Sequence, residues 1–249
     1  MPVVVERDGR VLVIEIQREE KRNAIDPDLT TGIDAALNEL EDDPELWVGI
    51  ITGGTSVFSA GSDLRLTGGR PTPRGGEYGV IRRAHVKPLI AAVEGLALGG
   101  GMEIVLACDL VIASHSASFG LPEIKRGLLA LYGGVFRAPR ALPLNIAKEV
   151  VLTGDPISAE RAAAFGFVNL LCANGQALAE AKKMAARIVV NAPISVRESL
   201  RVVERTIGAF DDFAWEATKD AARVVYASDD SREGREAFLE KRDAVWRNH

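Results

Sequence analysis

Residues 95–109 read GLALGGGMEIVLACD, in which a cluster of glycines separates two apolar segments. The apolar run 89–93 leads into these glycines and predicts a buried strand, and 102–108 has the apolar spacing of a short helix. A third buried strand is expected at 110–113. Strand, glycine turn and helix in this order predict an α/β fold with parallel strands, whose carboxyl ends gather ligand-binding groups.

The residues before this stretch repeat the pattern. A β-hairpin is expected within 3–16, because β-branched residues alternate around the turn dipeptide Asp8-Gly9. A helix is expected to begin at Asp26-Pro27 and to end near Asp42. The apolar run 47–52 then leads into a second glycine-rich turn, GGTSVFSAGSDL. Two glycine turns should therefore lie at the same edge of one sheet.

The last hundred residues have a helical pattern. Helices are expected at 145–152, 158–164, 176–190, 193–208, 211–226 and 231–247. Residues 65–79, RLTGGRPTPRGGEYG, have no apolar period and are rich in Gly, Pro and Arg, so they are expected to form a mobile surface loop.

Composition excludes several classes of protein. Thirty Lys and Arg against 35 Asp and Glu give a net charge of −5, so no global positive field is available for nucleic acid or an anionic membrane. Cys108 and Cys172 are expected to be buried free thiols, which fits a reducing compartment. The three histidines lack metal spacing and are expected on the surface or in loops, so no metal site is predicted. A cytoplasmic protein is expected.

The two glycine turns each offer a backbone N–H beside the start of a helix, that of Ser62 in SAGSDL and that of Gly100 in LGGGME. Two such groups directed at one oxygen would stabilise an enolate or a tetrahedral oxyanion. The same glycines also fit a purely structural role in tight packing, and the residues alone leave both interpretations open. A dinucleotide site is disfavoured, because Ile104 stands where the last glycine of G-x-G-x-x-G belongs.

Two glutamates lie in otherwise apolar segments: Glu103 follows the second glycine turn, and Glu123 follows Leu121-Pro122. Carboxylates are seldom buried without a partner or a function. Two of them around one water can divide the work, one accepting a proton and the other donating one. The structural alternative is that Glu103 caps a helix or forms a salt bridge and that Glu123 pairs with Lys125 or Arg126.

With these residues placed, the sequence resembles the crotonase, or enoyl-CoA hydratase, superfamily nearly end to end. The resemblance rests on GLALGGGMEIVLACD and on RNAI (22–25), FSAGSDL (58–64), ASFGLPEIKRG (117–127), YGGVFRAPR (132–140) and EGREAFLEKRDAVW (233–246). It implies a crotonase (ClpP-like) spiral of repeated β-β-α units over residues 1–190, followed by a C-terminal helical trimerisation region over 191–249. It also implies a homotrimer or a dimer of trimers.

The resemblance further implies the reaction and its site. The substrate would be a 2-enoyl-CoA thioester, to which water adds in a syn manner, or from whose product water is removed, with no permanently bound cofactor. The Ser62 and Gly100 amides would form the oxyanion hole, with the serine side chain unused, and Glu103 and Glu123 would hold the water, Glu123 protonating C2. Residues carried over as CoA or substrate contacts are Arg22, Ala24, Ala60, Asp63, Leu64, Gly99, Pro122, Leu131, Phe238 and Lys241, the last two at the nucleotide of a neighbouring subunit.

One feature departs from the hydratase pattern. Leu131-Tyr132 stand where hydratases commonly have a glycine and a small residue, and the amide at the first position helps to hold the catalytic water. A smaller acyl pocket or a displaced water is expected, which argues against long straight acyl chains, and the loop 65–79 is expected to lie over this pocket. Two alternatives stay open: another acyl-CoA reaction, either isomerisation of a 3-enoyl-CoA or dehydration of a polar hydroxyacyl-CoA, and a non-catalytic acyl-CoA-binding protein.

Overall fold

Two β-sheets organise the protein, whose computed structural model describes residues 2–66 and 69–247. The larger sheet has the strand order β1-β2-β3-β4-β6-β9 and the smaller one β5-β7-β8. The strands are β1 Val3–Asp8, β2 Val11–Ile16, β3 Val48–Thr52, β4 Leu89–Val93, β5 Leu96–Leu98, β6 Leu110–Ser114, β7 Ser118–Gly120, β8 Ile157–Ser158 and β9 Leu170–Cys172. The successive pairs β4–β5, β6–β7 and β8–β9 each place one strand in each sheet, which confirms the expected spiral of β-β-α units.

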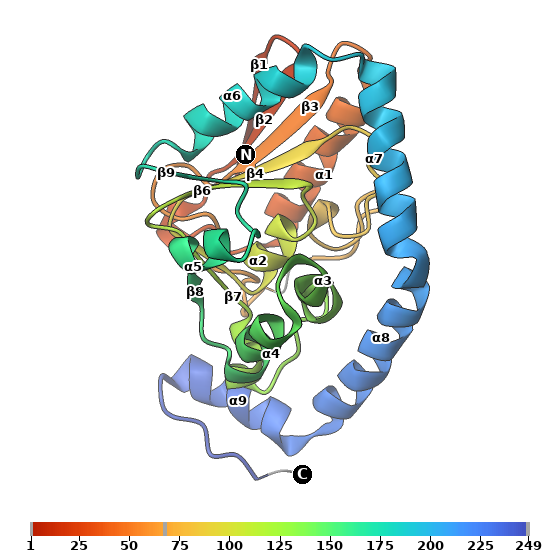
Figure 1. The fold of residues 1–249 in the computed structure, drawn as a ribbon. Helices are drawn as coiled ribbons and strands as arrows, with labels where there is room; N and C mark the ends of the chain where they lie inside the picture. Colours follow the sequence, from red (N-terminus) through yellow and green to blue (C-terminus); the bar gives the residue numbers. More distant parts are fainter. Residues whose placement is uncertain (1, 67–68, 248–249) are drawn as a thin grey trace.

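Helices connect and cover these strands (Figure 1). The α-helices are α1 Pro27–Asp42, α2 Gly100–Val105, α3 Gly134–Ala141, α4 Leu144–Thr153, α5 Ala159–Ala164, α6 Ala177–Val189, α7 Pro193–Ile207, α8 Asp211–Ala227 and α9 Asp229–Glu240. Short 3₁₀ helices are η1 Glu19–Lys21, η2 Glu77–Gly79, η3 Pro122–Arg126 and η4 Gly208–Phe210. The helix expected after Asp26 is present, because the Asp26 carboxylate accepts a hydrogen bond from the Leu29 amide and Pro27 fits the first turn.

The four inner strands of the larger sheet, β2, β3, β4 and β6, are buried on both faces, as parallel strands usually are, whereas the edge strands β1 and β9 are partly exposed. After the antiparallel β1–β2 hairpin, each neighbouring pair in this sheet is parallel. Val48 and Ile50 of β3 belong to the cluster that α6 covers, whereas Ile51 belongs to the larger cluster with α1 (Figure 1). Gly49 between them leaves room for α1, because a Cβ there would lie 2.6 Å from Leu40 Cδ2.

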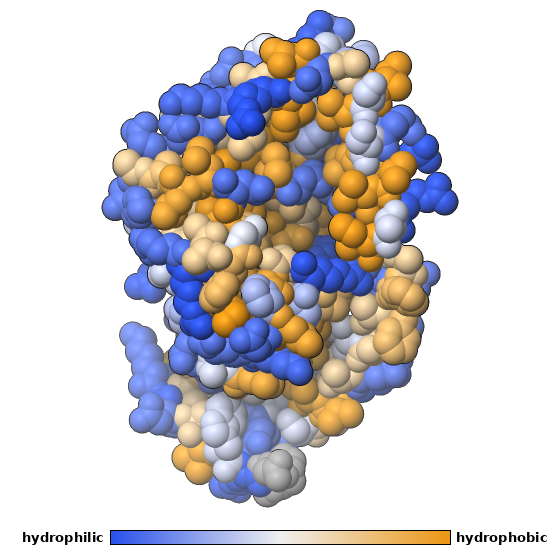
Figure 2. Space-filling model, in the orientation of Figure 1, coloured by the Kyte–Doolittle hydropathy of each residue, from blue (hydrophilic) through white to orange (hydrophobic). Residues whose placement is uncertain are grey.

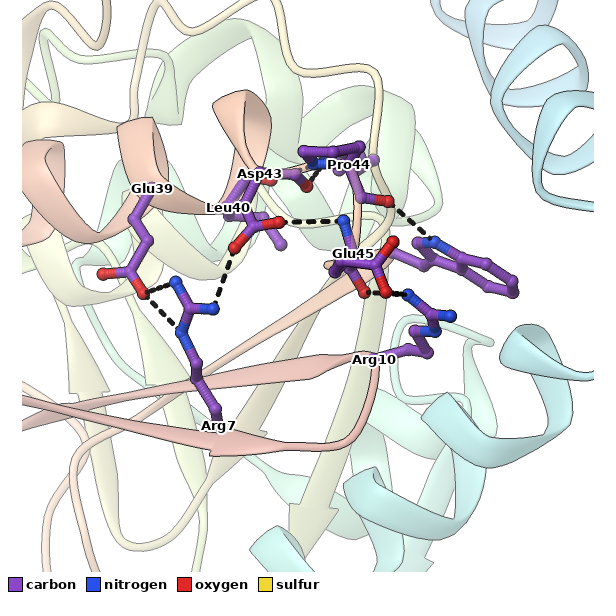
Figure 3. A network of polar contacts seen from close by, with 9 residues as sticks. Arg7, Arg10, Glu39, Leu40, Asp43, Pro44 and Glu45 are labelled. Atoms are coloured by element: carbon purple, nitrogen blue, oxygen red, sulfur yellow. Dashed lines mark hydrogen bonds and ion pairs between the residues drawn. The ribbon is translucent and has the colours of Figure 1, made fainter.

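Polar contacts tie the hairpin to the end of α1 (Figure 3). Arg7 of β1 donates to Glu39 at 2.6 Å and to Asp43 at 2.8 Å. Arg10, in the hairpin turn, pairs with Glu45. These side chains are exposed, so each pair contributes little free energy, and their main effect is to fix how the hairpin sits against the helix.

The C-terminal helices extend from the core. In Figure 1, α7 and α8 run along the outside of the molecule, and α9 returns to pack against η3. Among the described residues, no helix is long and apolar enough to cross a membrane. A division of the chain at residue 190 stays a prediction.

Several expected elements have other limits. The helix expected at 102–108 is α2, which begins at Gly100 and ends at Val105. The last helix, expected to reach 247, ends at Glu240 because Lys241 adopts a left-handed φ of +56°. Helix α3 was not expected, since it contains Pro139. For α2 and α9 the spacing of apolar residues predicts that a helix is present but not the residues at which its backbone hydrogen bonds begin and end.

The expected exposure of the segment 65–79 is wrong for its last residues, and one loop histidine is less exposed than a surface residue. The segment 65–79 was expected to form a mobile surface loop, and residues 67–68 of it lie outside the described chain, but Tyr78 in η2 is only 2% exposed. His85 lies in the loop before β4, as expected, but its side chain is only 9% exposed and bonds to Asp109 at 3.1 Å. Both side chains are buried because polar partners distant in sequence satisfy them.

Asn23 is the polar residue that ties the segment before α1 to the first glycine turn. It is fully buried, and its amide donates to the carbonyls of Gly53 and Val57 at 2.9 and 2.8 Å. Its Oδ1 accepts from the Arg18 amide at 2.8 Å. Its φ of +53° is left-handed, a conformation that asparagine tolerates better than most residues.

We expect Asn23→Ala to lower the free energy of unfolding by roughly 2–4 kcal/mol, because it leaves buried carbonyls without partners. Urea unfolding followed by circular dichroism measures this change. The matched control is Asn191→Ala, which removes an exposed amide that also bonds to two carbonyls and should change stability by less than about 1 kcal/mol. Equal effects of the two variants would contradict the role assigned to Asn23.

Candidate active site

The two glycine turns predicted from sequence lie in contact. Ser59 pairs with Ala97 in an isolated parallel bridge, and Gly61 has a φ of +92°. A Cβ on Gly61 would lie 2.8 Å from the Leu98 carbonyl and 3.0 Å from the Gly100 amide nitrogen, so only glycine permits this approach. Within the described chain, neither the Ser62 nor the Gly100 amide donates to another protein atom. Both N–H groups are therefore available to a ligand oxygen.

Residues 22–25 run beside the first of these turns. The Ala60 amide donates to Arg22 O at 3.0 Å, and the Asp63 amide donates to Ile25 O at 2.8 Å. The predicted CoA contacts on these two segments are thereby brought together, namely Arg22, Ala24, Ala60, Asp63 and Leu64. The Asp63 carboxylate is engaged by Arg18 at 3.0 Å, so it mainly orders this edge of the site.

Glu103 lies in α2, immediately after the second turn, and is 1% exposed. Its Oε1 accepts hydrogen bonds from the amides of Tyr132, at 2.7 Å, and Gly134, at 3.1 Å. A Cβ on Gly134 would itself lie 3.1 Å from this oxygen. The segment around Leu131-Tyr132 thus presents backbone groups to the carboxylate, whatever its side chains are.

Glu123 approaches from the other side, on η3 after Pro122. Its Oε1 is 3.1 Å from the position that a Cβ of Gly99 would occupy, which places the carboxylate beside the second glycine turn. Its Oε2 is buried, and no described residue hydrogen-bonds to it. The two glutamates, Gly99 and Pro122 therefore belong to one site, together with the free amides.

Burial and mutual repulsion dominate the electrostatics of the glutamates. Burial, and then the charge of Glu123, raises the pKa of Glu103 to about 8, against the opposing effect of the two amides. Burial raises the pKa of Glu123 to about 7. Because two close carboxylates are rarely both ionised, the pair holds about one proton at neutral pH. Such a pair contains one acid and one base.

Sequence reasoning missed Tyr78, which completes this site. Its hydroxyl lies 2.5 Å from Ser62 Oγ, and its ring meets that of Tyr132 edge to face with centroids 5.0 Å apart. Burial, and then the charge of Glu103, raises the pKa of Tyr78 well above its usual range. The available signal was that Tyr78 is the one aromatic residue in the polar, glycine-rich stretch 65–79.

The predicted nucleotide contacts Phe238 and Lys241 lie at the end of α9. The Arg126 guanidinium of the same chain is 4.6 Å from the centre of the Phe238 ring, and the expected contact with the nucleotide of a neighbouring subunit stays a prediction. A cavity of about 240 Å³ opens between η3 and α9, and its lining includes Lys125, Arg126 and Arg242. Within residues 2–66 and 69–247, no three His, Cys, Asp or Glu side chains are grouped to hold a metal ion.

Comparisons with known proteins find similar chains along nearly the whole length of this one. The family model for enoyl-CoA hydratase/isomerase matches residues 6–249. A short-chain-enoyl-CoA hydratase of Clostridium acetobutylicum is 35% identical over 96% of this chain and 95% of its own length. A carnitinyl-CoA dehydratase of Salmonella heidelberg is 37% identical over 97% of this chain and 96% of its own. The crystal structure of a carnitinyl-CoA hydratase from Mycobacterium avium, 44% identical, superposes with a TM-score of 0.94 and covers 100% of this chain and 99% of that one.

Glu123→Gln should stabilise the fold at pH 8 and have little effect at pH 4. The pKa of Glu123 rises from 4.5 to about 7 on folding, so the folded state binds its proton more tightly and the wild type loses stability as the pH rises through this window. Glutamine cannot ionise and escapes this loss. Urea unfolding at both pH values measures the difference.

The control for this experiment is Glu149→Gln. Glu149 is exposed and its hydrogen bond to Arg161 lowers its pKa, so its replacement should not stabilise the protein at pH 8. If Glu123→Gln behaves like this control at both pH values, the raised pKa is refuted.

Proposed function

The chain belongs to the enoyl-CoA hydratase/isomerase family, and from this premise we propose that it catalyses the reversible addition of water to the 2,3 double bond of a 2-enoyl-CoA thioester. One observation carries the proposal: two buried carboxylates with raised pKa values lie beside two free backbone amides. Relatives with other reactions need not keep both acids, whereas hydration uses an acid and a base together.

The proposed reaction follows from these groups. The thioester oxygen accepts hydrogen bonds from the amides of Ser62 and Gly100, which stabilise the enolate that forms when water attacks C3. Each such donor contributes roughly 2.7–4 kcal/mol of transition-state stabilisation. Water and the carboxylates supply every atom that is transferred, so the reaction needs no permanently bound cofactor.

The hydrogen bonds assign the two glutamates. Glu103 accepts two amide hydrogen bonds on one oxygen, which favours its ionised form, so it takes the proton from water as the hydroxyl adds to C3. Without substrate the higher pKa, about 8, is that of Glu103, against about 7 for Glu123, so the shared proton must move to Glu123 before it reaches C2. The assignment therefore rests on hydrogen bonding: two amides stabilise ionised Glu103, whereas Glu123 has a buried oxygen without a described partner, from which it gives the proton to C2. In the reverse direction the same two proton transfers remove water from a 3-hydroxyacyl-CoA.

The coenzyme A portion is proposed to lie along residues 22–25 and 60–64. An acidic protein needs a local basic cluster for the phosphates of coenzyme A, and the cavity between η3 and α9 offers Lys125, Arg126 and Arg242. Phe238 and Lys241 adjoin this cavity and are proposed to contact the nucleotide.

A second substrate class is supported by the tyrosines. Tyr78 and Tyr132 meet edge to face beside Glu103, which accepts a hydrogen bond from the Tyr132 amide. Their hydroxyls suit a polar acyl group, and two of the similar proteins are named for carnitinyl-CoA, a 3-hydroxyacyl thioester with a quaternary ammonium group. Dehydration of carnitinyl-CoA is therefore the second candidate reaction, and comparing it with crotonyl-CoA hydration decides between them.

The C-terminal helices suggest the assembly. Figure 2 shows hydrophobic side chains along the column formed by α7. Large apolar residues on α7, η4 and α8 are exposed: Ile194, Val202, Val203, Ile207, Phe210, Phe213 and Val224. Such a patch is typical of an interface. We propose a cytoplasmic homotrimer or dimer of trimers, with neither nucleic acid nor membrane as a partner.

Light scattering during size-exclusion chromatography should give three or six times the chain mass of 26.7 kDa. Phe213→Asp, which places a charge at a 75% exposed phenylalanine of α8, should reduce this mass. Lys219→Asp on the same helix is the control and should leave the mass unchanged. A wild-type monomer would refute the proposed assembly.

Glu123→Gln should lower hydration of crotonyl-CoA by at least about a hundredfold while leaving binding of the thioester within a few-fold, because the variant cannot protonate C2. The loss of ultraviolet absorbance of the conjugated thioester measures turnover, and calorimetry measures binding. Glu149→Gln, which removes an exposed carboxylate paired with Arg161, should hydrate at the wild-type rate. Unchanged turnover in Glu123→Gln would refute the mechanism, and binding without turnover in the wild type would favour a non-catalytic acyl-CoA-binding protein.

A further inference from the structure

Tyr78 touches both residues whose amides form the proposed oxyanion hole. Its hydroxyl is 2.5 Å from Ser62 Oγ. On the other side, a Cβ on Gly100 would lie 2.6 Å from that hydroxyl and 2.7 Å from ring atoms Cε2 and Cζ. The ring is 2% exposed, so these contacts are made away from bulk water.

The backbone is strained in order to place this ring. Tyr78 has φ +53° and ψ +11°, which is a left-handed conformation. For any residue other than glycine, this conformation is unfavourable in free energy. The neighbouring glycines hold it there: a Cβ on Gly75 would lie 1.9 Å from Gly79 O, and one on Gly79 would lie 2.5 Å from Thr30 O. Backbone strain of this kind is concentrated at functional sites. Here the strained conformation places the Tyr78 side chain against Ser62 and Gly100.

The protons of the hydroxyl pair can be counted. Each hydroxyl carries one proton, and their mutual hydrogen bond uses one of them. Burial, and then the charge of Glu103, raises the pKa of Tyr78, so the phenol keeps its proton at neutral pH. Either hydroxyl could donate in this contact, and because a phenol is the stronger acid of the two, we take Tyr78 as the donor to Ser62. The Ser62 hydroxyl proton is then left for a further acceptor, beside the free amide of the same residue.

We propose that the Ser62 hydroxyl, oriented and polarised by Tyr78, donates a third hydrogen bond to the thioester oxygen. Ser62 would then contact the substrate through its side chain as well as its amide, and Tyr78 is a positioning residue that acts through it. The proton stays on Ser62 Oγ throughout, and the bond strengthens as negative charge develops on the thioester oxygen. This inference rests on the proposed hydratase function.

Four variants test it: Tyr78→Phe, Ser62→Ala, the double variant and Ser62→Thr. Tyr78→Phe keeps the ring against Gly100 and Tyr132 and removes only the hydroxyl. Each single hydroxyl deletion should lower kcat for crotonyl-CoA by up to about tenfold, the effect of one hydrogen bond, with KM changed less than about twofold. The double variant should resemble Ser62→Ala, because Tyr78 acts through Ser62, and Ser62→Thr should retain much of the activity.

A spectroscopic measurement separates this role from a structural one. Hydrogen bonds that polarise the thioester carbonyl shift the absorbance of bound 2,4-hexadienoyl-CoA to longer wavelength, and a Glu123→Gln background prevents its hydration. Deletion of either hydroxyl should reduce this shift. An unchanged shift, or additive losses of kcat in the double variant accompanied by a higher KM, would overturn the proposal. If the wild type fails to hydrate crotonyl-CoA, the proposed function fails; if it hydrates and the variants equal it, only this inference fails.

Discussion

The close approach of two glycine turns is the constraint on which the site depends. Three glycines at this contact leave no room for a side chain. A Cβ on Gly61 would lie 2.8 Å from Leu98 O, one on Gly95 would lie 2.1 Å from Ser56 O, and one on Gly101 would lie 2.4 Å from Ser59 O. The sequence left open whether these glycines serve packing or an oxyanion hole. In the structure, packing supports the oxyanion hole that we propose, because the contact between the turns places Gly61, the residue before Ser62, against the Gly100 amide.

The packing of the glycine turns stabilises the fold, whereas the buried carboxylate pair destabilises it. Glu103 and Glu123 are buried close to each other, and each lacks a direct ion pair among the described residues. Ionising either one costs stability at neutral pH, so the site is maintained by the rest of the fold. A sheet with α1 on one face and α6 on the other can offset such a cost, since its four inner strands are buried on both sides.

Local patterns made most of the fold predictable. Alternation and the Asp8-Gly9 turn predicted the hairpin, and Asp26-Pro27 predicted the start of α1 within one residue. Other features depend on partners distant in sequence, which a pattern cannot contain. His85 is buried because Asp109, 24 residues away, bonds to it, and Tyr78 is buried because of Ser62 and Gly100. The two glutamates were recognisable as a pair, but their relation to the Tyr132 and Gly134 amides was not.

The position of Leu131-Tyr132 shows how chemistry and specificity can separate in such a site. These residues depart from the hydratase pattern in their side chains, yet the contribution of Tyr132 to Glu103 is its amide, which any residue except proline supplies. The oxyanion donors that we propose at Ser62 and Gly100 are amides as well. Because backbone groups carry these contacts, side chains can change the shape and polarity of the acyl pocket while the proton-transfer groups stay in place. This separation explains how relatives of 35% and 37% identity can bear the names of a short-chain-enoyl-CoA hydratase and a carnitinyl-CoA dehydratase.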